Sequence, residues 1–188
     1  MASHSQRPRG ERLIIGMTGR IGSGKTTVGK YLETEYGFQY LRYSAVLADW
    51  LAQDPESKSQ LQRIGWEVMA GGMQAELNRR LIARILPNRD VVVDGLRHPL
   101  DYETLRDTAS SDFRLFFIAS TPSLRFERLQ VRGRYEDLAT FELSDSHPVE
   151  QQIDLFRANA SLVINNDGSL PDLYNVVDKA ICLYRKEG

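Results

Sequence analysis

A glycine-rich octet near the N-terminus has the residue types and spacing to bind phosphate. Residues 19–26 read Gly-Arg-Ile-Gly-Ser-Gly-Lys-Thr, which fits the pattern G-x-x-x-x-G-K-[ST]. Glycine has no Cβ, so its backbone can adopt positive φ, pass close to a phosphate and point its N–H groups inward. We expect Lys25 to reach the β- and γ-phosphates and the Thr26 hydroxyl to ligate Mg²⁺. The octet therefore predicts a nucleoside triphosphate site.

The flanking residues support this interpretation. An apolar run, residues 13–17, precedes the octet, and Val28, Tyr31 and Leu32 follow it at helical spacing. A strand, a loop and a helix in this order place the positive end of the helix against the bound anion. The residues expected to contact ATP here are Gly19, Arg20, Ile21, Gly22, Ser23, Gly24, Lys25, Thr26 and Thr27.

Asp94 is a second candidate, because it follows three β-branched residues typical of a strand buried on both faces. Parallel sheets bind ligands at the carboxyl ends of their strands. Asp94 could hold Mg²⁺ through water or accept a proton from an attacking group. Alternatively, it only closes the strand into an Asp-Gly turn. Arg97 is expected to project into the same cleft.

Basic residues cluster after the fourth apolar run. Arg125, Arg128 and Arg132 are three and four residues apart and therefore share a helix face, and Arg134 follows directly. Phosphoryl transfer spreads negative charge over equatorial oxygens, which arginines can neutralise. Arg128, Arg132 and Arg134 are thus candidate catalytic residues on a lid over residues 128–146. The alternative is a solvated helix face paired with neighbouring carboxylates.

Two further arginines, Arg42 and Arg63, are candidates to hold the phosphate of an acceptor, together with Arg97. The helical patterns over residues 44–86 are longer than a crossover between parallel strands requires. We therefore expect this region to bind the acceptor substrate. Surface arginines are common in such segments, so the alternative of a solvated role stays open for both residues.

Composition indicates an ordinary globular domain. The chain has 188 residues, 41% hydrophobic and 26% charged, with a formal net charge of −1. This charge argues against a nucleic-acid partner, and no apolar run is long enough to cross a membrane. The single cysteine, Cys182, suits a reducing compartment and is expected to be buried in a helix. We expect a cytoplasmic protein with a disordered leader over residues 1–10 and one domain over residues 11–188.

Apolar runs alternate with helical patterns, which favours an α/β fold with a mainly parallel sheet. Five strands are expected, and the strand before the glycine-rich octet is placed in the centre. A helix is predicted over residues 73–86, and residues 133–146 form a charged stretch with little periodicity.

The chain resembles the P-loop small-molecule kinases, specifically the dephospho-CoA kinases and (deoxy)nucleoside monophosphate kinases. Residues 14–19 through 28, together with residues 36–38, look like the opening of the dephospho-CoA kinases, and residues 165–170 look like their turn near the adenine of ATP. The resemblance implies a three-layer P-loop NTPase fold, with a five-stranded sheet flanked by helices. It also implies that Asn165, Asn166 and Gly168 lie near the base of ATP.

The middle of the chain departs from the dephospho-CoA kinase pattern. That family carries a strand-end aspartate after the first helix, whereas residues 40–44 here contain no carboxylate. Residues 94–97, Asp-Gly-Leu-Arg, are instead similar to the Asp-Gly-x-x-Arg of nucleoside monophosphate kinases, whose arginine holds the acceptor phosphate. The spacing of Arg128 and Arg132 likewise resembles the arginines that border their lid.

The prediction is an ATP- and Mg²⁺-dependent kinase of a nucleotide-like small molecule, most simply a (deoxy)nucleoside monophosphate. Thr26 and Asp94 are the expected metal-binding residues. Dephospho-CoA kinase is the alternative within the class, and a nucleotide-binding regulatory module without turnover is the alternative outside it. GTP as donor, the oligomeric state, any protein partner and the need for Asp94 as a base stay open.

Overall fold

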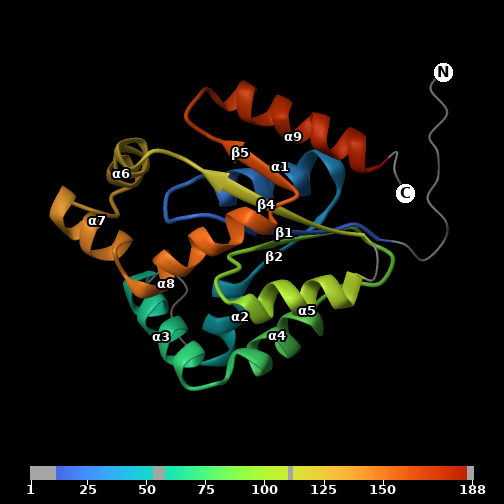
Figure 1. Cartoon of the computed structure of the whole chain (residues 1–188), viewed down its shortest axis with the longest axis horizontal. Coiled ribbons are helices and arrows are strands. Elements are labelled where there is room, and N and C mark those ends of the chain that lie inside the picture. Colours follow the sequence, from blue (N-terminus) through green and yellow to red (C-terminus); the bar gives the residue numbers. More distant parts are fainter. Residues whose placement is uncertain (1–11, 53–57, 110–111, 186–188) are drawn as a thin grey trace.

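The sheet has five parallel strands, with the strand that leads into the glycine-rich loop in the middle. The computed structural model describes residues 12–52, 58–109 and 112–185, so the predicted leader over residues 1–10 lies outside the described residues. The strand order is β2-β3-β1-β4-β5, and every pairing is parallel (Figure 1). The strands are β1 (Ile14–Thr18), β2 (Gln39–Arg42), β3 (Val91–Asp94), β4 (Phe113–Ala119) and β5 (Leu162–Asn165).

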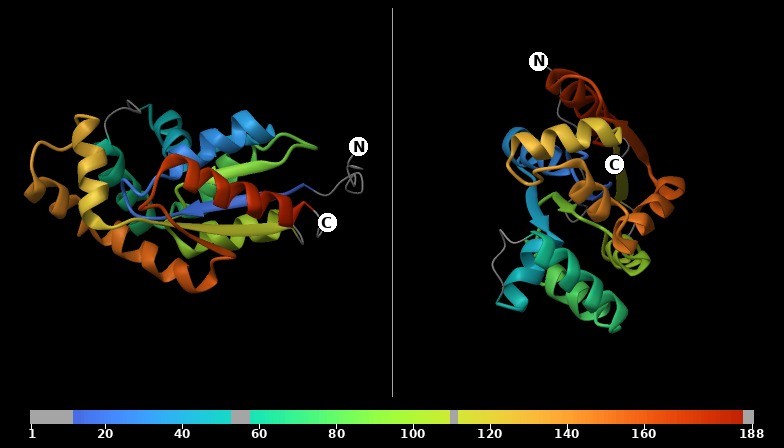
Figure 2. Two further views of the ribbon diagram at one scale, coloured as in Figure 1. Left: turned by 90° about the horizontal axis from the view of Figure 1, so that it is seen from above. Right: turned by 90° about the vertical axis from the view of Figure 1, so that its left-hand side faces the viewer.

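Helices cover both faces of this sheet, which confirms the three-layer P-loop NTPase fold (Figure 2). Side chains of a strand alternate between the faces, so β1 contributes to two cores. Leu13, Ile15 and Met17 belong to a core with α1 (Lys25–Tyr36) and α9 (Leu170–Tyr184). Ile14 belongs to the opposite core, with Val91, Val93 and apolar residues of the helices that follow β2 and β3.

The region predicted to bind the acceptor is helical. It contains α2 (Tyr43–Trp50), α3 (Lys58–Ala70) and α4 (Gln74–Ile82). Helix α2 packs on both α3 and α4, and α4 packs on α5 (Pro99–Ala109). The helix predicted over residues 73–86 is shorter in the structure, where α4 spans Gln74–Ile82. Two turn bonds follow it, from Arg84 N to Leu81 O and from Ile85 N to Ile82 O.

The segment after β4 is also mostly helical. It comprises α6 (Pro122–Val131), α7 (Leu138–Asp145), α8 (Pro148–Gln151) and a 3₁₀ helix, η1 (Gln152–Asn159). Sequence periodicity did not reveal α7, since only Phe141 of this short helix is buried. A local signal was present: the Asp137 side chain accepts a hydrogen bond from Thr140 N and caps the helix.

The C-terminal helix α9 begins with a capping box. Ser169 Oγ accepts from Asp172 N, and the Asp172 carboxylate accepts from Ser169 N. Cys182 lies on this helix but is exposed, so the expectation of a buried cysteine was wrong. The buried face of α9 contains Val177 and Ile181, and Cys182 falls just outside it.

Candidate functional site

The glycine-rich loop joins β1 to α1 and needs its glycines. Gly19 has a φ of 143°, and a Cβ there would lie 2.2 Å from the Ile118 carbonyl oxygen. Gly24 has a φ of 108°, and a Cβ there would lie 2.2 Å from Asn166 Nδ2. That amide donates to Ser23 O at 2.8 Å. The residue after β5 therefore contacts the glycine-rich loop directly, and a side chain at position 24 would clash with Asn166.

Lys25 is the first residue of α1, and its ammonium group folds back over the loop. Its Nζ donates to Gly19 O at 2.5 Å and to Arg20 O at 3.1 Å. Burial lowers the pKa of Lys25, and the nearby carboxylates of Asp94 and Glu150 oppose that shift. A partly buried cation at a helix N-terminus is suited to bind the phosphates of a nucleotide.

Asp94 and Thr26 lie together at the entrance to the loop. Sheet register places Asp94 between Met17 of β1 and Arg42 of β2. The Thr26 hydroxyl donates to Asp94 Oδ2 at 3.4 Å, and the Tyr40 hydroxyl donates to the same oxygen at 2.8 Å. Burial and the neighbouring Asp94 charge raise the pKa of Tyr40 above its ordinary value, so its hydroxyl keeps the proton that it donates to Asp94 even in alkaline solution.

This oxygen pair fits a Mg²⁺ ion that arrives with phosphates. Mg²⁺ prefers one or two carboxylates, phosphate oxygens and several waters. Asp94 is 7% exposed and stands one hydrogen bond from Thr26, so the two can share such an ion. The described residues contain no group of three or more His, Cys, Asp or Glu side chains arranged to hold a metal by themselves.

A pocket of about 190 Å³ extends from the loop toward α2, α3 and α4. Lys25, Thr26 and Asp94 line one end. The pocket is also lined by four arginines: Arg42, Arg97, Arg132 and Arg134. It therefore brings together residues of the glycine-rich octet, the Asp94 strand end, the predicted lid and the predicted acceptor region. Arg63 is not among its lining residues. It is exposed on α3 and pairs with Glu67 one helical turn later at 3.2 Å.

Arg97 meets a partner that sequence reasoning missed. Its Nη1 donates to the carboxylate of Glu150, which is fully buried. Glu150 Oε2 accepts from the backbone N–H of Ile21 at 2.9 Å. The Glu150 carboxylate thus binds two groups at once: an N–H group of the phosphate loop, and an arginine that was predicted to bind the acceptor. No sequence motif marks Glu150, which lies in the four-residue helix α8.

The arginines of α6 separate into different roles. Arg125 has a side chain 3% exposed and pairs with Asp145 at 2.6 Å. Arg128 donates to Asn166 O at 2.8 Å and to Ser120 Oγ at 3.1 Å, and it does not line the pocket. Arg132 and Arg134 lie past the end of α6, are exposed and do line it. The prediction that these arginines share one functional face is therefore only partly right, because Arg125 is buried in an ion pair with Asp145.

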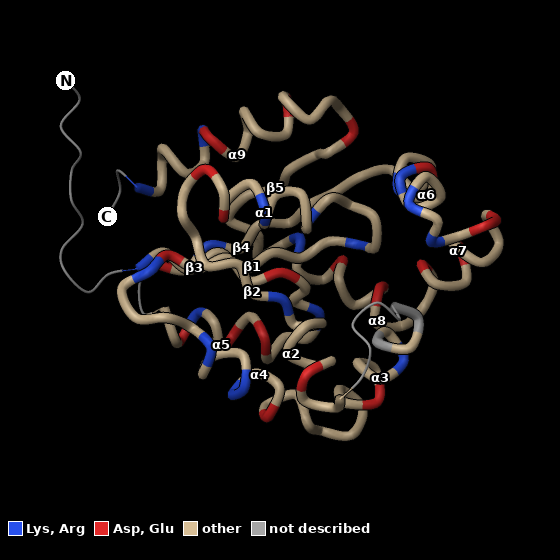
Figure 3. Tube along the Cα trace, turned by 180° about the vertical axis from the view of Figure 1, so that it is seen from behind, with Lys and Arg blue, Asp and Glu red and all other residues tan. Residues whose placement is uncertain are grey.

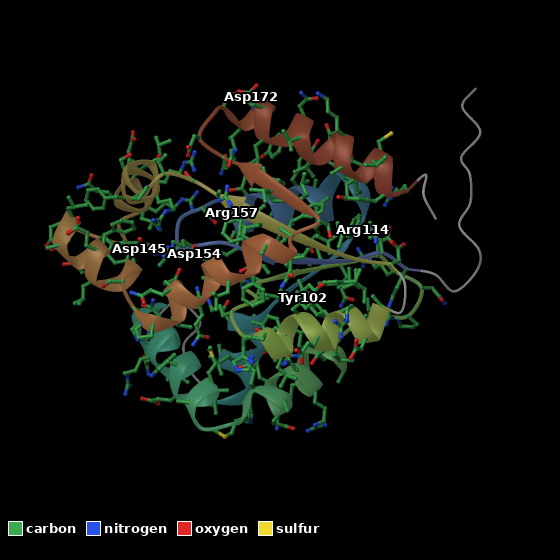
Figure 4. The ribbon with its side chains drawn as sticks, viewed as in Figure 1. Tyr102, Arg114, Asp145, Asp154, Arg157 and Asp172 are labelled. Atoms are coloured by element: carbon green, nitrogen blue, oxygen red, sulfur yellow. The ribbon has the colours of Figure 1, made fainter. Side chains whose placement is uncertain are left out.

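Arg20, which was predicted to contact ATP, also makes ion pairs that hold neighbouring segments together. Its guanidinium bridges Asp145 at the end of α7, at 3.3 Å, and Asp154 on η1, at 2.6 Å. These two carboxylates lie near each other in Figure 4. Figure 3 shows the same region as basic positions on α6 beside acidic positions on α7. Together with Arg125, Arg20 ties α7 to the glycine-rich loop.

The loop after β5, where the base of ATP is expected, contacts both the glycine-rich loop and α6. Asn166 is buried, whereas Asn165 and Gly168 are exposed. Asp167 Oδ1 accepts from Thr121 N at 2.9 Å and from Ser120 Oγ at 2.8 Å. None of the three predicted residues lines the pocket around Lys25, although Asn166 contacts the glycine-rich loop at Ser23 O.

A second, more open hollow adjoins the first. It has a volume of about 560 Å³ and shares Thr26, Arg42, Arg132 and Arg134 with the pocket. Its lining adds the cations of Lys30 and Arg84 and contains no Asp or Glu. Arg84 is paired with Asp49 at 2.8 Å. The entrance to the site is therefore positively charged, although the whole chain is not.

Comparison with known proteins places the chain among nucleotide-binding domains. The model of the family described as AAA domain matches residues 15–150. A UPF0200 protein of Aeropyrum pernix is 30% identical over 176 residues, covering 86% of this chain and 88% of the relative. A dephospho-CoA kinase of Bacillus thuringiensis subsp. konkukian is 27% identical, covering 84% and 90%.

Solved structures agree on the fold. Shikimate kinase from Bacteroides thetaiotaomicron superimposes with a TM-score of 0.60 at 16% identity, covering 91% of this chain and 97% of that structure. At this identity the likeness shows the fold alone. Within the described residues, no helix has the length and apolar character to cross a membrane.

Proposed function

The chain belongs to the AAA domain family and to the UPF0200 family, and we infer that it is an ATP-dependent small-molecule kinase whose acceptor is a (deoxy)nucleoside monophosphate. One observation carries this proposal: the phosphate-loop lysine, an aspartate at a strand end and four arginines line one pocket. The dephospho-CoA kinase among its relatives supports the class of reaction.

ATP would bind with its phosphates in the loop of residues 19–27 and its base near Asn165, Asn166 and Gly168. The loop N–H groups and Lys25 would neutralise the β- and γ-phosphates. Thr26 and Asp94 would hold Mg²⁺, which supplies charge neutralisation between the phosphates. The Tyr40 hydroxyl, by donating to Asp94 Oδ2, keeps that carboxylate in place.

The acceptor phosphate would meet Arg42 and Arg97, which both line the pocket. A phosphate oxygen is already ionised at neutral pH, so its attack on the γ-phosphorus needs no strong general base. This agrees with the absence of a carboxylate at residues 40–44. Arg132 and Arg134 would neutralise the charge that develops on the transferred group. Arg63 is the weakest of the predicted acceptor residues, because it points away to Glu67.

Dephospho-CoA is the second candidate acceptor. The 27% identical relative and the resemblance of residues 165–170 to the adenine turn of that family favour it. Its reacting group is a sugar hydroxyl, which must lose a proton. Asp94 is then the group available to accept the proton, since it is the buried carboxylate beside Thr26.

A product assay tests the proposal. The protein is incubated with ATP and Mg²⁺ and with each common monophosphate or dephospho-CoA, and products are identified by mass. We expect a diphosphate from at least one monophosphate, and the Lys25→Met variant should lose turnover with an unchanged melting temperature. CoA as the sole product would replace the first acceptor with the second. Hydrolysis or binding of ATP without any phosphorylated acceptor would favour a regulatory module.

A further inference from the structure

Gln74, at the start of α4, presents an unsatisfied group at the acceptor end of the pocket. The residue is 5% exposed and lines the pocket. The amide nitrogen Nε2 donates to Asp101 Oδ1 at 2.5 Å. The amide oxygen Oε1 is buried and has no hydrogen-bond partner among the described residues. Buried polar atoms almost always have partners, so this oxygen calls for a specific explanation.

The orientation of the Gln74 amide is set by Asp101. The other carboxylate oxygen, Oδ2, accepts from the backbone N–H groups of Arg97 at 3.0 Å and of His98 at 2.9 Å. Burial raises the pKa of Asp101, but the N–H groups of Arg97, His98 and Gln74 oppose this shift and favour the ionised form, which only accepts hydrogen bonds. The Gln74 nitrogen therefore faces Oδ1. The oxygen is consequently the atom of this pocket-lining side chain that stays without a partner, since a rotation of the amide by 180° would bring two acceptors together.

Apolar side chains also line this pocket, namely Leu47, Met69 and Leu77, beside polar ones such as Ser44 and Gln62. Tyr43 also lines it, but its hydroxyl donates to Asn78 Oδ1 at 2.5 Å and is already used. The pocket thus offers apolar walls and, in Gln74 Oε1, a hydrogen-bond acceptor that no described residue uses. A flat heterocycle with an N–H group matches both features, because its ring can pack on the apolar walls while the N–H group donates to this oxygen.

We propose that Gln74 is a specificity-determining residue: its Oε1 accepts a hydrogen bond from a ring or exocyclic N–H group on the base of the acceptor. The proposal rests on the proposed function, since it assigns the base end of the acceptor whose phosphate meets Arg42 and Arg97. It predicts that the base enters between α2 and α4, and that acceptors without an N–H donor on the base are rejected.

The first test uses pairs of acceptors that differ in one amino group. AMP is compared with purine riboside monophosphate, and CMP with the monophosphate of 2-pyrimidinone riboside. Binding is measured by calorimetry with a non-hydrolysable ATP analogue, and turnover with ATP. In the pair whose skeleton fits the pocket, we expect the amino-bearing member to be preferred by ~10- to 100-fold, because its absence leaves the buried oxygen unpaired.

The second test changes the residue. Gln74→Met keeps the size of the side chain and its helix propensity but removes the amide. We expect the preference within the pair to fall to within ~3-fold, mainly through loss of affinity for the amino-bearing acceptor. Gln62→Met is the matched control, because Gln62 lines the same pocket while its Nε2 donates to Ser144 O at 3.2 Å. This control should keep the wild-type preference.

The outcomes separate this proposal from the proposed function. If monophosphates are phosphorylated but wild type treats both members of each pair alike, Gln74 does not read the base and only the present proposal fails. The same holds if Gln74→Met keeps the full preference. If no monophosphate binds or is phosphorylated, the proposed acceptor and the proposal for Gln74 are both overturned.

Discussion

Two arginines of one segment, Arg125 and Arg132, should respond in opposite ways to the same substitution. The Arg125 guanidinium bonds both carboxylate oxygens of Asp145, at 2.6 and 2.8 Å, and also Ile21 O at 3.1 Å. It lies 5.3 Å from the centre of the Phe141 ring. Arg132 is exposed, lines the pocket and makes no ion pair with any residue that the structure describes.

The magnitudes follow from these contacts. Removing one partner of a buried ion pair costs ~3–5 kcal/mol. Asp145 is 16% exposed and keeps Arg20 as a partner, so the lower limit of about 3 kcal/mol applies to Arg125→Met. For a domain of this size, each kcal/mol lowers the melting temperature by ~2–4 °C, which gives a fall of roughly 6–12 °C. Arg132→Met should change stability by less than ~0.5 kcal/mol.

Activity should show the reverse order. Arg132→Met should lower kcat by ~10³-fold, the range for an arginine that neutralises the transferred phosphoryl group. Arg125→Met, assayed well below its melting temperature, should lose less than ~10-fold. Both variants are measured by thermal unfolding and by steady-state turnover with the best acceptor. Equal melting temperatures for Arg125→Met and wild type would refute the structural role. Wild-type kcat in Arg132→Met would refute the catalytic one.

Two further predictions concern other groups. Glu150→Gln removes the charge that pairs with Arg97 but keeps an acceptor for Ile21 N. Arg97 is then free to bind a phosphate-bearing acceptor, whose KM should fall by ~3- to 10-fold. A rise in KM would mean that Glu150 positions Arg97 for binding instead. Burial and the hydrogen bond to Asp178 raise the pKa of Tyr36 to about 12, above its usual value of about 10. The folded state therefore keeps this proton to a higher pH than the unfolded state does. The contribution of the protonated Tyr36 to the free energy of unfolding should be lost as pH rises from ~10 to ~12. If the denaturant midpoint of Tyr36→Phe falls over this range as steeply as that of wild type, the prediction is wrong.

The glycine-rich octet and the order of elements were readable from the sequence because they depend on local signals. Positive φ at Gly19 and Gly24, the apolar strand before them and the helix after them are encoded within some twenty residues. Alternation of apolar runs with helical patterns predicted a mainly parallel sheet of five strands, and the strand before the octet was expected in its centre, where β1 lies. The place of Asp94 beside Thr26 followed from the rule that parallel strands end at one edge.

Other features depended on contacts between segments far apart in the chain. Helical spacing put Arg125, Arg128 and Arg132 on one face, but only packing of α7 showed that Arg125 is buried against Asp145, twenty residues later. Likewise, the shared pocket excludes Arg63 and includes Arg42, a difference that no local pattern distinguishes. The same limit applied to α7, whose one buried residue left no periodic signal.

Local sequence encodes the phosphate loop, the α/β fold and the class of chemistry, because each arises from backbone freedom and side-chain period within short segments. Which polar groups meet in the pocket depends instead on the packing of distant segments. Glu150 reaches Arg97 across 53 residues, and Gln74 reaches Asp101 across 27. Such partners are chosen by how helices pack and by the need to satisfy buried charge, and these interactions leave no spacing that a linear pattern can reveal.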